Sequence, residues 1–125
     1  IVLDIDHFKQ VNDTYGHPTG DAVICDLVSR VQQILNTTSS IGRVGGEEFT
    51  ILLEGHTLMQ AVSLASRLHQ DLNRMPLSVL PQQRVTASFG VSWAPEKTRF
   101  DALYGAADAA LYQAKEKGRN RVEFQ

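Results

Sequence analysis

Apolar residues fall along the chain in two patterns, short continuous runs and longer stripes with a spacing of three and four. The run Ile1–Ile5 is typical of a buried strand, although a run this short is ambiguous by periodicity alone. Stripes with helical spacing recur over residues 24–35, 58–72 and 100–114. Each stripe predicts an amphipathic helix with one face turned toward a core.

Two further apolar runs, Ile41–Val44 and Phe49–Leu53, flank the four residues Gly45-Gly46-Glu47-Glu48. Because Gly-Gly is a favoured hairpin dipeptide, this segment predicts a β-hairpin. The remaining strands are predicted at Val85–Trp93 and Arg121–Phe124.

Polar residues mark the expected loops and helix ends. The stretch Asp6–Asp21 is rich in glycine, proline and other turn residues, and predicts a loop around a short helical turn. Thr57 with Gln60 resembles a capping box, and Thr98 with Asp101 is expected to cap the third helix.

The predicted order of elements is therefore β-α-β-β-α-β-α-β. Its first six elements form the split βαβ arrangement, in which helices pack on one face of a largely antiparallel sheet. We predict an α+β sandwich with a ferredoxin-type βαββαβ core, a largely antiparallel central sheet flanked by helices. Within the strand Val85–Trp93, Gly90 indicates a bulge or the close approach of another backbone.

Composition narrows the class of protein. The 125 residues suit one domain, and 42% hydrophobic with 21% charged residues is ordinary for a globular protein. A net charge of −2 argues against a nucleic-acid partner, and the absence of a long apolar run argues against membrane contact. Cys25 has no partner for an internal disulfide, so we expect a cytoplasmic location. The chain begins within a predicted strand, and we expect a leading segment to be missing.

Carboxylates gather at the predicted strand ends. Asp4 and Asp6 close the first strand, and Glu47 and Glu48 lie in the hairpin. These four acids could converge around a cation, because Mg²⁺ prefers carboxylate, phosphate and water oxygens. The alternative is that acids beside turns are simply solvated.

Two other features have both a structural and a functional interpretation. Gly45 and Gly46 satisfy a hairpin turn, or they let a nucleotide approach the backbone. The segment Lys115–Arg121 holds four cations in seven residues, which either end a helix favourably or neutralise a triphosphate.

Three separated motifs resemble the GGDEF family of diguanylate cyclases. The hairpin Gly45-Gly46-Glu47-Glu48-Phe49 resembles the family signature in its Glu-for-Asp form. The opening motif is matched by Leu3–Lys9, Asn12-Asp13, Gly16-His17 and Gly20-Asp21, and the closing motif by Tyr112–Val122. The resemblance covers the whole chain, and it implies a palm-like, nucleotidyl cyclase-like fold and residues 1–125 as one GGDEF domain that lacks its usual leading helix.

The resemblance also implies an activity, the condensation of two GTP molecules into cyclic di-GMP and two pyrophosphates. It assigns Asp4, Glu47 and the carbonyl of Ile5 as ligands of Mg²⁺ or Mn²⁺. Glu48 is implied as a second metal ligand or as the group that takes the proton from the attacking 3′-hydroxyl. Because each domain binds one GTP, the resemblance implies a homodimer, with an upstream sensory or receiver domain controlling the pairing.

The family's substrate contacts carry over residue by residue. Lys115, Arg119 and Lys9 are implied as phosphate ligands, and Asn12 and Asp21 as the residues that read guanine. A carboxylate at Asp21 accepts two adjacent N–H donors of guanine, whereas adenine offers a different pattern. The rest of the implied binding set comprises Phe8, His17, Gly45 and Gly46. For His17 a structural hydrogen bond is an equally good interpretation.

The sequence departs from the family at the product-inhibition site, an Arg-x-x-Asp beginning nine residues before the first signature glycine. Asn36-Thr37-Thr38-Ser39 stands there, so both charges are absent and we expect little feedback inhibition. The main alternative to a cyclase is a catalytically silent GTP-binding sensor or regulatory module. A structural interaction domain is a third possibility, but it leaves the joint spacing of the three motifs unexplained.

Overall fold

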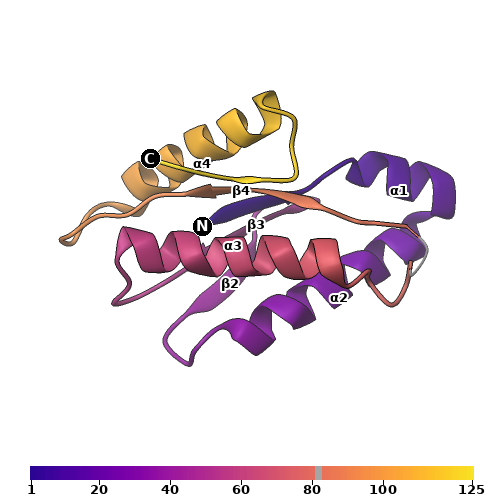
Figure 1. Ribbon diagram of the computed structural model, residues 1–125, viewed down its shortest axis with the longest axis horizontal. Coiled ribbons are helices and arrows are strands. Elements are labelled where there is room, and N and C mark those ends of the chain that lie inside the picture. Colours follow the sequence, from indigo (N-terminus) through magenta and orange to yellow (C-terminus); the bar gives the residue numbers. More distant parts are fainter. Residues whose placement is uncertain (81–82) are drawn as a thin grey trace.

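Strand β1 (Val2–Ile5) lies at the centre of a five-stranded sheet in the computed structural model, which describes residues 1–80 and 83–125 (Figure 1). The strand order is β2-β3-β1-β4-β5. The other strands are β2 (Ser40–Arg43), β3 (Glu48–Leu52), β4 (Ala87–Val91) and β5 (Val122–Phe124). The helices are α1 (Phe8–Tyr15), α2 (His17–Ile34), α3 (Leu58–Arg74) and α4 (Phe100–Glu116).

The sheet is largely antiparallel, as predicted. Strand β1 pairs antiparallel with β3 and with β4, and β2 pairs antiparallel with β3. Only β4 and β5 are parallel among the described strands, and α4 makes the crossover between them. The predicted α+β fold class and hairpin are therefore confirmed, with strand ends shifted by one or two residues.

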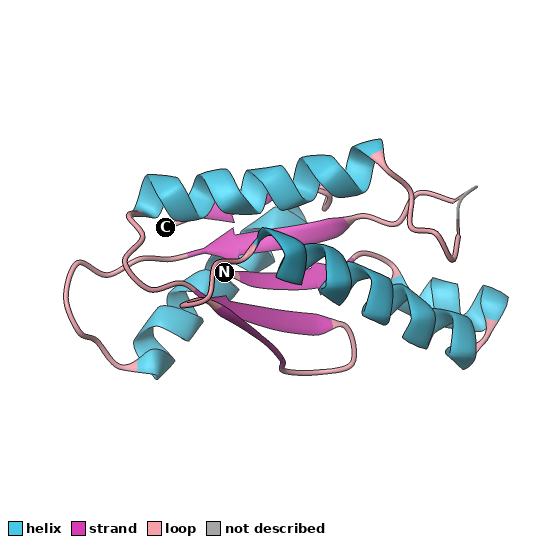
Figure 2. Cartoon of the chain, turned by 90° about the horizontal axis from the view of Figure 1, so that it is seen from below, coloured by secondary structure: helices cyan, strands magenta, loops and turns pink. Residues whose placement is uncertain are grey.

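Helices cover both faces of the sheet. Helices α2 and α3 lie on one face and α4 on the other, and Figure 2 views the molecule from the side of α2 and α3. Leu3 and Ile5 of β1 are buried in the main core, whereas Val2 packs with Ala107 and Leu111 of α4. Because side chains alternate along a strand, Asp4 lies on the α4 face together with Val2.

The structure confirms one of the two roles predicted for Gly90, the close approach of another backbone. A Cβ atom at this position would lie 2.0 Å from the carbonyl oxygen of Ala107 and 2.4 Å from the nitrogen of Leu111. Glycine therefore lets α4 rest directly on β4, which fixes the height of α4 above the ends of β1 and β3.

The prediction of a loop around a short helical turn over Asp6–Asp21 is right about helical structure but wrong about its extent, because most of the segment folds into α1 and the start of α2. Its turn residues are compatible with two helices that meet at a sharp break. Gly16 occupies the break with φ of 92°, and Pro18 lies in the first turn of α2, where no backbone N–H is needed.

Helix caps were predicted correctly at one site and wrongly at another. In the capping box of α3, Gln60 N donates to Thr57 Oγ1 (3.2 Å) and Thr57 N donates to Gln60 Oε1 (2.9 Å). Helix α4 instead begins after Arg99, with no side-chain cap, so the expected Thr98–Asp101 cap does not form. None of the helices in the described part of the chain is long and apolar enough to cross a membrane.

Candidate active site

Two carboxylates meet where β1 and β3 end. Asp4 and Glu48 are directly paired across the two antiparallel strands, so their side chains share the α4 face of the sheet. The backbone links the neighbouring residues as well, since Ile5 N donates to the carbonyl oxygen of Glu47 over 3.1 Å. Register thus brings Asp4 to the same end of the sheet as Glu47 and Glu48, although more than 40 residues separate it from them in the sequence.

A cation from α4 completes this cluster. Lys115 Nζ lies 2.8 Å from Asp4 Oδ2, and the Asp4 side chain is only 14% exposed. The last turn of α4 passes over β1, so its lysine reaches the strand end. Asp4 therefore has a counter-charge, whereas Glu48 has no lysine or arginine within salt-bridge distance among the described residues.

Glu48 instead accepts a hydrogen bond from the Tyr104 hydroxyl, 3.1 Å from its Oε2. Burial raises the pKa of Glu48 above its ordinary 4.5, and the charges of Asp108 and Asp4 raise it further. Tyr104 and Lys115 act in the opposite direction. Burial, with the hydrogen bond to Glu48, also raises the pKa of Tyr104 above 10.0, so this phenol remains a donor at neutral pH.

The acids fit a divalent cation that is completed by other ligands. No three His, Cys, Asp or Glu side chains in residues 1–80 and 83–125 form a metal-binding group by themselves. Asp4 and Glu48, with Glu47 beside them, nevertheless present hard oxygen atoms. Mg²⁺ is usually held by one or two carboxylates together with phosphate and water, and this donor set matches that preference.

Asp6 does not belong to this group, contrary to the expected convergence of four acids. It is buried at 7% exposure, and its oxygens accept hydrogen bonds from Thr86 Oγ1 (2.7 Å), Ser88 Oγ (2.7 Å) and Asn120 N (3.0 Å). A carboxylate that is satisfied by three protein donors is a structural anchor.

Asp6 anchors the turn that follows α4. Arg119 and Asn120 both have left-handed backbones, with φ of 65° and 49°. Besides Asp6, Asn120 is held by His69, whose Nε2 lies 2.8 Å from its carbonyl oxygen and 2.9 Å from its Oδ1. No sequence pattern predicts this network, because His69 lies on the α3 stripe and Asn120 within a run of cations.

The cations of the basic segment have different partners in the described residues. Lys117 pairs with Glu123 at 3.1 Å, and Arg121 Nε donates to the carbonyl oxygen of Arg119 at 3.2 Å. Arg119 is exposed, and Lys115 is half-buried at the acids. Of the two phosphate ligands predicted in this segment, Lys115 is thus paired with Asp4 and Arg119 is exposed to solvent.

The hairpin turn is open on its outer side. Gly45 and Gly46 are exposed, neither has a positive φ, and an added Cβ would meet nothing within 4 Å. The turn geometry thus does not require glycine, which favours the interpretation that a ligand approaches here. Arg43, which sequence reasoning missed, holds the turn by donating to the carbonyl oxygens of Gly45 (Nε, 3.1 Å) and Gly46 (Nη2, 2.7 Å).

The remaining predicted residues lie on α1 and α2. Lys9, His17 and Asp21 are exposed, and no hydrogen bond or ion pair joins them to the acids in the described residues. The Phe8 side chain is buried in the main core, so only its backbone N–H at the start of α1 is placed to meet a ligand.

Asn12 is partly buried, and its Oδ1 has no hydrogen-bond partner among the described residues. Gly20 gives this side chain its space, since a Cβ there would lie 1.8 Å from Asn12 Oδ1. This amide oxygen therefore lies unpaired and buried in the packing between α1 and α2.

The loop at Asn36–Ser39 is closed on itself. Asn36 Oδ1 accepts hydrogen bonds from Thr38 N (3.2 Å), Thr38 Oγ1 (3.0 Å) and Ser39 Oγ (2.7 Å). Asn36 thus stabilises a local turn instead of presenting a charge to solvent.

With the fold and the site established, comparison with known proteins identifies the class. The family model described as "Diguanylate cyclase, GGDEF domain" matches residues 1–121, and the chain belongs to the GGDEF family. Probable diguanylate cyclase DgcC of Escherichia coli K12 is 40% identical over 124 residues, which are 98% of this chain and 33% of that protein. The uncharacterized protein YhcK of Bacillus subtilis is 41% identical over 127 residues, covering 99% of this chain and 35% of YhcK. The chain thus spans about a third of the length of these relatives.

Solved structures agree with this assignment. The active GGEEF domain of a diguanylate cyclase from Vibrio cholerae matches with a TM-score of 0.90 at 36% identity, covering 98% of this chain and 79% of that one. The GGDEF domain of DgcB from Caulobacter crescentus, in complex with c-di-GMP, matches with a TM-score of 0.87 at 34% identity, covering 98% and 74%.

Proposed function

We propose that this domain is an active diguanylate cyclase, which joins two GTP molecules into cyclic di-GMP and releases two pyrophosphates. The observation that carries the proposal is the cluster of Asp4, Glu48 and Lys115, in which two paired carboxylates and one cation meet beside an open glycine turn. This arrangement suits a reaction in which negative phosphate charge must be held and neutralised.

In each half-reaction the 3′-oxygen of one GTP forms a bond to the α-phosphorus of the other. The bond from that phosphorus to the bridging oxygen of pyrophosphate breaks, and the 3′-hydroxyl loses its proton. Asp4 and Glu47, with the carbonyl of Ile5, are the proposed ligands of Mg²⁺ or Mn²⁺. The ion, when bound, lowers the pKa of the hydroxyl and neutralises phosphate charge. Glu48 is either a further ligand or the acceptor of the proton.

The other residues bind and orient the substrate. Lys115 lies in the last turn of α4, and Arg119 in the anchored turn that follows it. Lys9 and the backbone N–H of Phe8 lie at the start of α1. All four groups are proposed to hold phosphate oxygens. Gly45 and Gly46 leave room for the nucleotide. Guanine is proposed to bind between α1 and α2, where Asn12 Oδ1 lacks a partner and Asp21 follows Gly20, with His17 orienting the loop.

The reaction needs two domains, because the product contains two phosphodiester bonds and each domain supplies one GTP. We therefore propose a transient or stable homodimer with the two sites face to face, controlled by other modules of the parent protein. Nucleic acid and membrane are not proposed as partners.

The test is to incubate concentrated protein with GTP and Mg²⁺, and to separate the nucleotides by chromatography. Glu48→Gln is the control, because it keeps the size of the side chain and removes its charge. Cyclic di-GMP formed by the parent and lost in the control supports the cyclase. GTP that binds but is not converted, even at high protein concentration, favours a catalytically silent GTP-binding module.

A further inference from the structure

Tyr104 contacts a reacting carboxylate, yet the proposed chemistry gives it no role. Its hydroxyl donates to Glu48 Oε2 over 3.1 Å, and both residues are half-buried. We propose that Tyr104 is a positioning residue that holds Glu48 in the orientation in which it binds the metal ion. This inference rests on the proposed function, since it concerns the same site.

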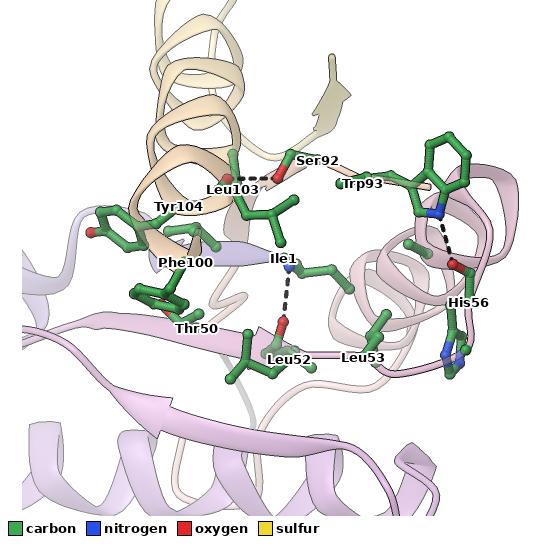
Figure 3. A pocket seen from close by; sticks show the side chains of 16 residues that line it. Ile1, Thr50, Leu52, Leu53, His56, Ser92, Trp93, Phe100, Leu103 and Tyr104 are labelled. Carbon is green, nitrogen blue, oxygen red and sulfur yellow. Dashed lines mark hydrogen bonds between the residues drawn. The ribbon is translucent and has the colours of Figure 1, made fainter. Parts of the chain in front are cut away.

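The Tyr104 ring is itself fixed in place. It stacks on Phe100 with ring centroids 5.8 Å apart and planes 27° apart, and both rings lie on the first turns of α4 near the strand that carries Thr50 (Figure 3). Behind it, Tyr104 packs against the small core of Val2, Ala107 and Leu111. Phe100 and Tyr104 also line a cavity together with Val2 and Ala107 of that core. The hydroxyl is therefore directed by packing before any ligand arrives.

Glu48 needs such a partner more than Asp4 does. It stands directly opposite Asp4 in the sheet and follows an exposed glycine turn, so like-charge repulsion would drive a free side chain away. Asp4 is already held by Lys115 at 2.8 Å. The phenol engages Oε2 of Glu48 and leaves Oε1 as the oxygen that can reach a cation.

Hydrogen bonds to carboxylate ligands elsewhere orient those ligands, and losing one typically weakens metal binding about 10- to 100-fold. Because Glu48 is only half-buried, we expect the lower end, about tenfold. A tyrosine that served only in packing would act through its ring, and phenylalanine keeps that ring. Tyr104→Phe therefore separates the two roles.

The experiment measures Mn²⁺ affinity by electron paramagnetic resonance, with a GTP analogue whose α,β-bridge is a methylene group. Parent protein, Tyr104→Phe and Tyr112→Phe are compared; Tyr112 is exposed on the same helix and serves as the matched control. We expect Mn²⁺ affinity to fall about tenfold in Tyr104→Phe and to stay unchanged in Tyr112→Phe. The melting temperatures of all three should agree within a few degrees. In turnover, kcat should fall while KM for GTP changes less than about twofold, since Tyr104 is not proposed to touch the nucleotide.

A double-mutant cycle tests whether the effect passes through Glu48. In the Glu48→Gln background, Tyr104→Phe should cause no further loss of Mn²⁺ affinity. A persistent loss there, or equal affinities for Tyr104→Phe and Tyr112→Phe in the parent background, overturns the inference. If the parent makes no cyclic di-GMP but Tyr104→Phe still weakens Mn²⁺ binding, the cyclase proposal fails and the positioning role stands. A parent that binds no Mn²⁺ with the analogue overturns both.

Discussion

Lys115 Nζ lies 2.8 Å from Asp4 Oδ2, although 111 residues separate the two along the chain. The contact joins the last turn of α4 to the end of β1 and places a cation beside the proposed metal ligand. Lys115 therefore has two possible partners, the Asp4 carboxylate in the protein without ligand and a phosphate once nucleotide is bound. A divalent ion that binds Asp4 competes with the lysine for the same charge.

Lys115→Met should accordingly have opposite effects on metal and on nucleotide. In protein without nucleotide, Mn²⁺ affinity should rise several-fold, because the cation that competes for Asp4 is gone. With metal present, GTP affinity should fall about tenfold, since a phosphate ligand is lost. Titration calorimetry measures both quantities. Lys117→Met is the control, because Lys117 pairs with Glu123 instead, and equal behaviour of the two variants would contradict the assignment.

Asp6→Asn should destabilise the fold and weaken substrate binding together. The amide nitrogen would face groups that now donate to the carboxylate, so the free energy of unfolding should fall by about 1–3 kcal/mol. GTP affinity should also fall, because Asp6 anchors the turn that carries Arg119. Urea unfolding and GTP titration provide the two readouts. Asp101→Asn, which removes only an exposed ion pair with Arg99, should change stability by less than about 1 kcal/mol.

Sequence patterns predicted the strands and the acids at their ends, because both can be recognised in short segments of the sequence. The continuous apolar run Ile1–Ile5 predicted the first strand, the glycine pair predicted the hairpin, and the split βαβ order allowed the two to be neighbours. The loop predicted around a short helical turn at Asp6–Asp21 underestimated the helices, since Gly16, Pro18 and Gly20 are typical turn residues. In the structure Gly16 separates two helices, Pro18 begins one, and Gly20 provides space for Asn12.

Residues that support the site from a distance left no such local pattern. Tyr104 has the spacing of a core residue on α4, and His69 that of a core residue on α3. Their hydrogen bonds to Glu48 and Asn120 arise only when helices and sheet are packed together. Asp6 shows the opposite error, because two acids one residue apart on a strand end suggested a shared role. Strand alternation would place both on one face, but β1 ends at Ile5 and the Asp6 carboxylate is held by Thr86, Ser88 and Asn120. Only Asp4 pairs with Lys115.

Glu48 should make the metal-free protein less stable as the pH rises. Burial raises the pKa of Glu48 above 4.5 in the folded state, so the folded protein binds more protons than the unfolded chain between the two pKa values. The contribution of protonated Glu48 to the free energy of unfolding is present in acid and is lost as the pH rises through the pKa of the folded state. Glu48→Gln has no carboxyl group to titrate at this position. Its free energy of unfolding, relative to that of the parent, should therefore increase from pH 4 to pH 7. Urea unfolding in the presence of a chelator measures the difference, and parallel profiles would refute the raised pKa.

Asp21→Ser should relax the discrimination between GTP and ATP. Asp21 is exposed in the free protein. Selectivity for GTP therefore requires that the bound guanine covers the Asp21 carboxylate and donates both of the base's N–H groups to it. A serine cannot accept both donors, and the preference for GTP should fall about 10- to 100-fold. Competition binding with the two nucleotides gives this ratio. Glu96→Ser, an exposed acid in the loop before α4, should keep the parent's preference.

Asn36→Arg combined with Ser39→Asp should introduce product inhibition, which we do not expect in the parent. In the parent, Asn36 Oδ1 accepts three local hydrogen bonds and presents no charge, so cyclic di-GMP should not inhibit at low-micromolar concentrations. The double variant supplies a guanidinium for phosphate and a carboxylate for the guanine edge. Titration calorimetry and initial rates with added product test both statements, with Ser39→Asp alone as the control. Strong inhibition of the parent that disappears in Asn36→Ala would show that the uncharged turn binds product after all.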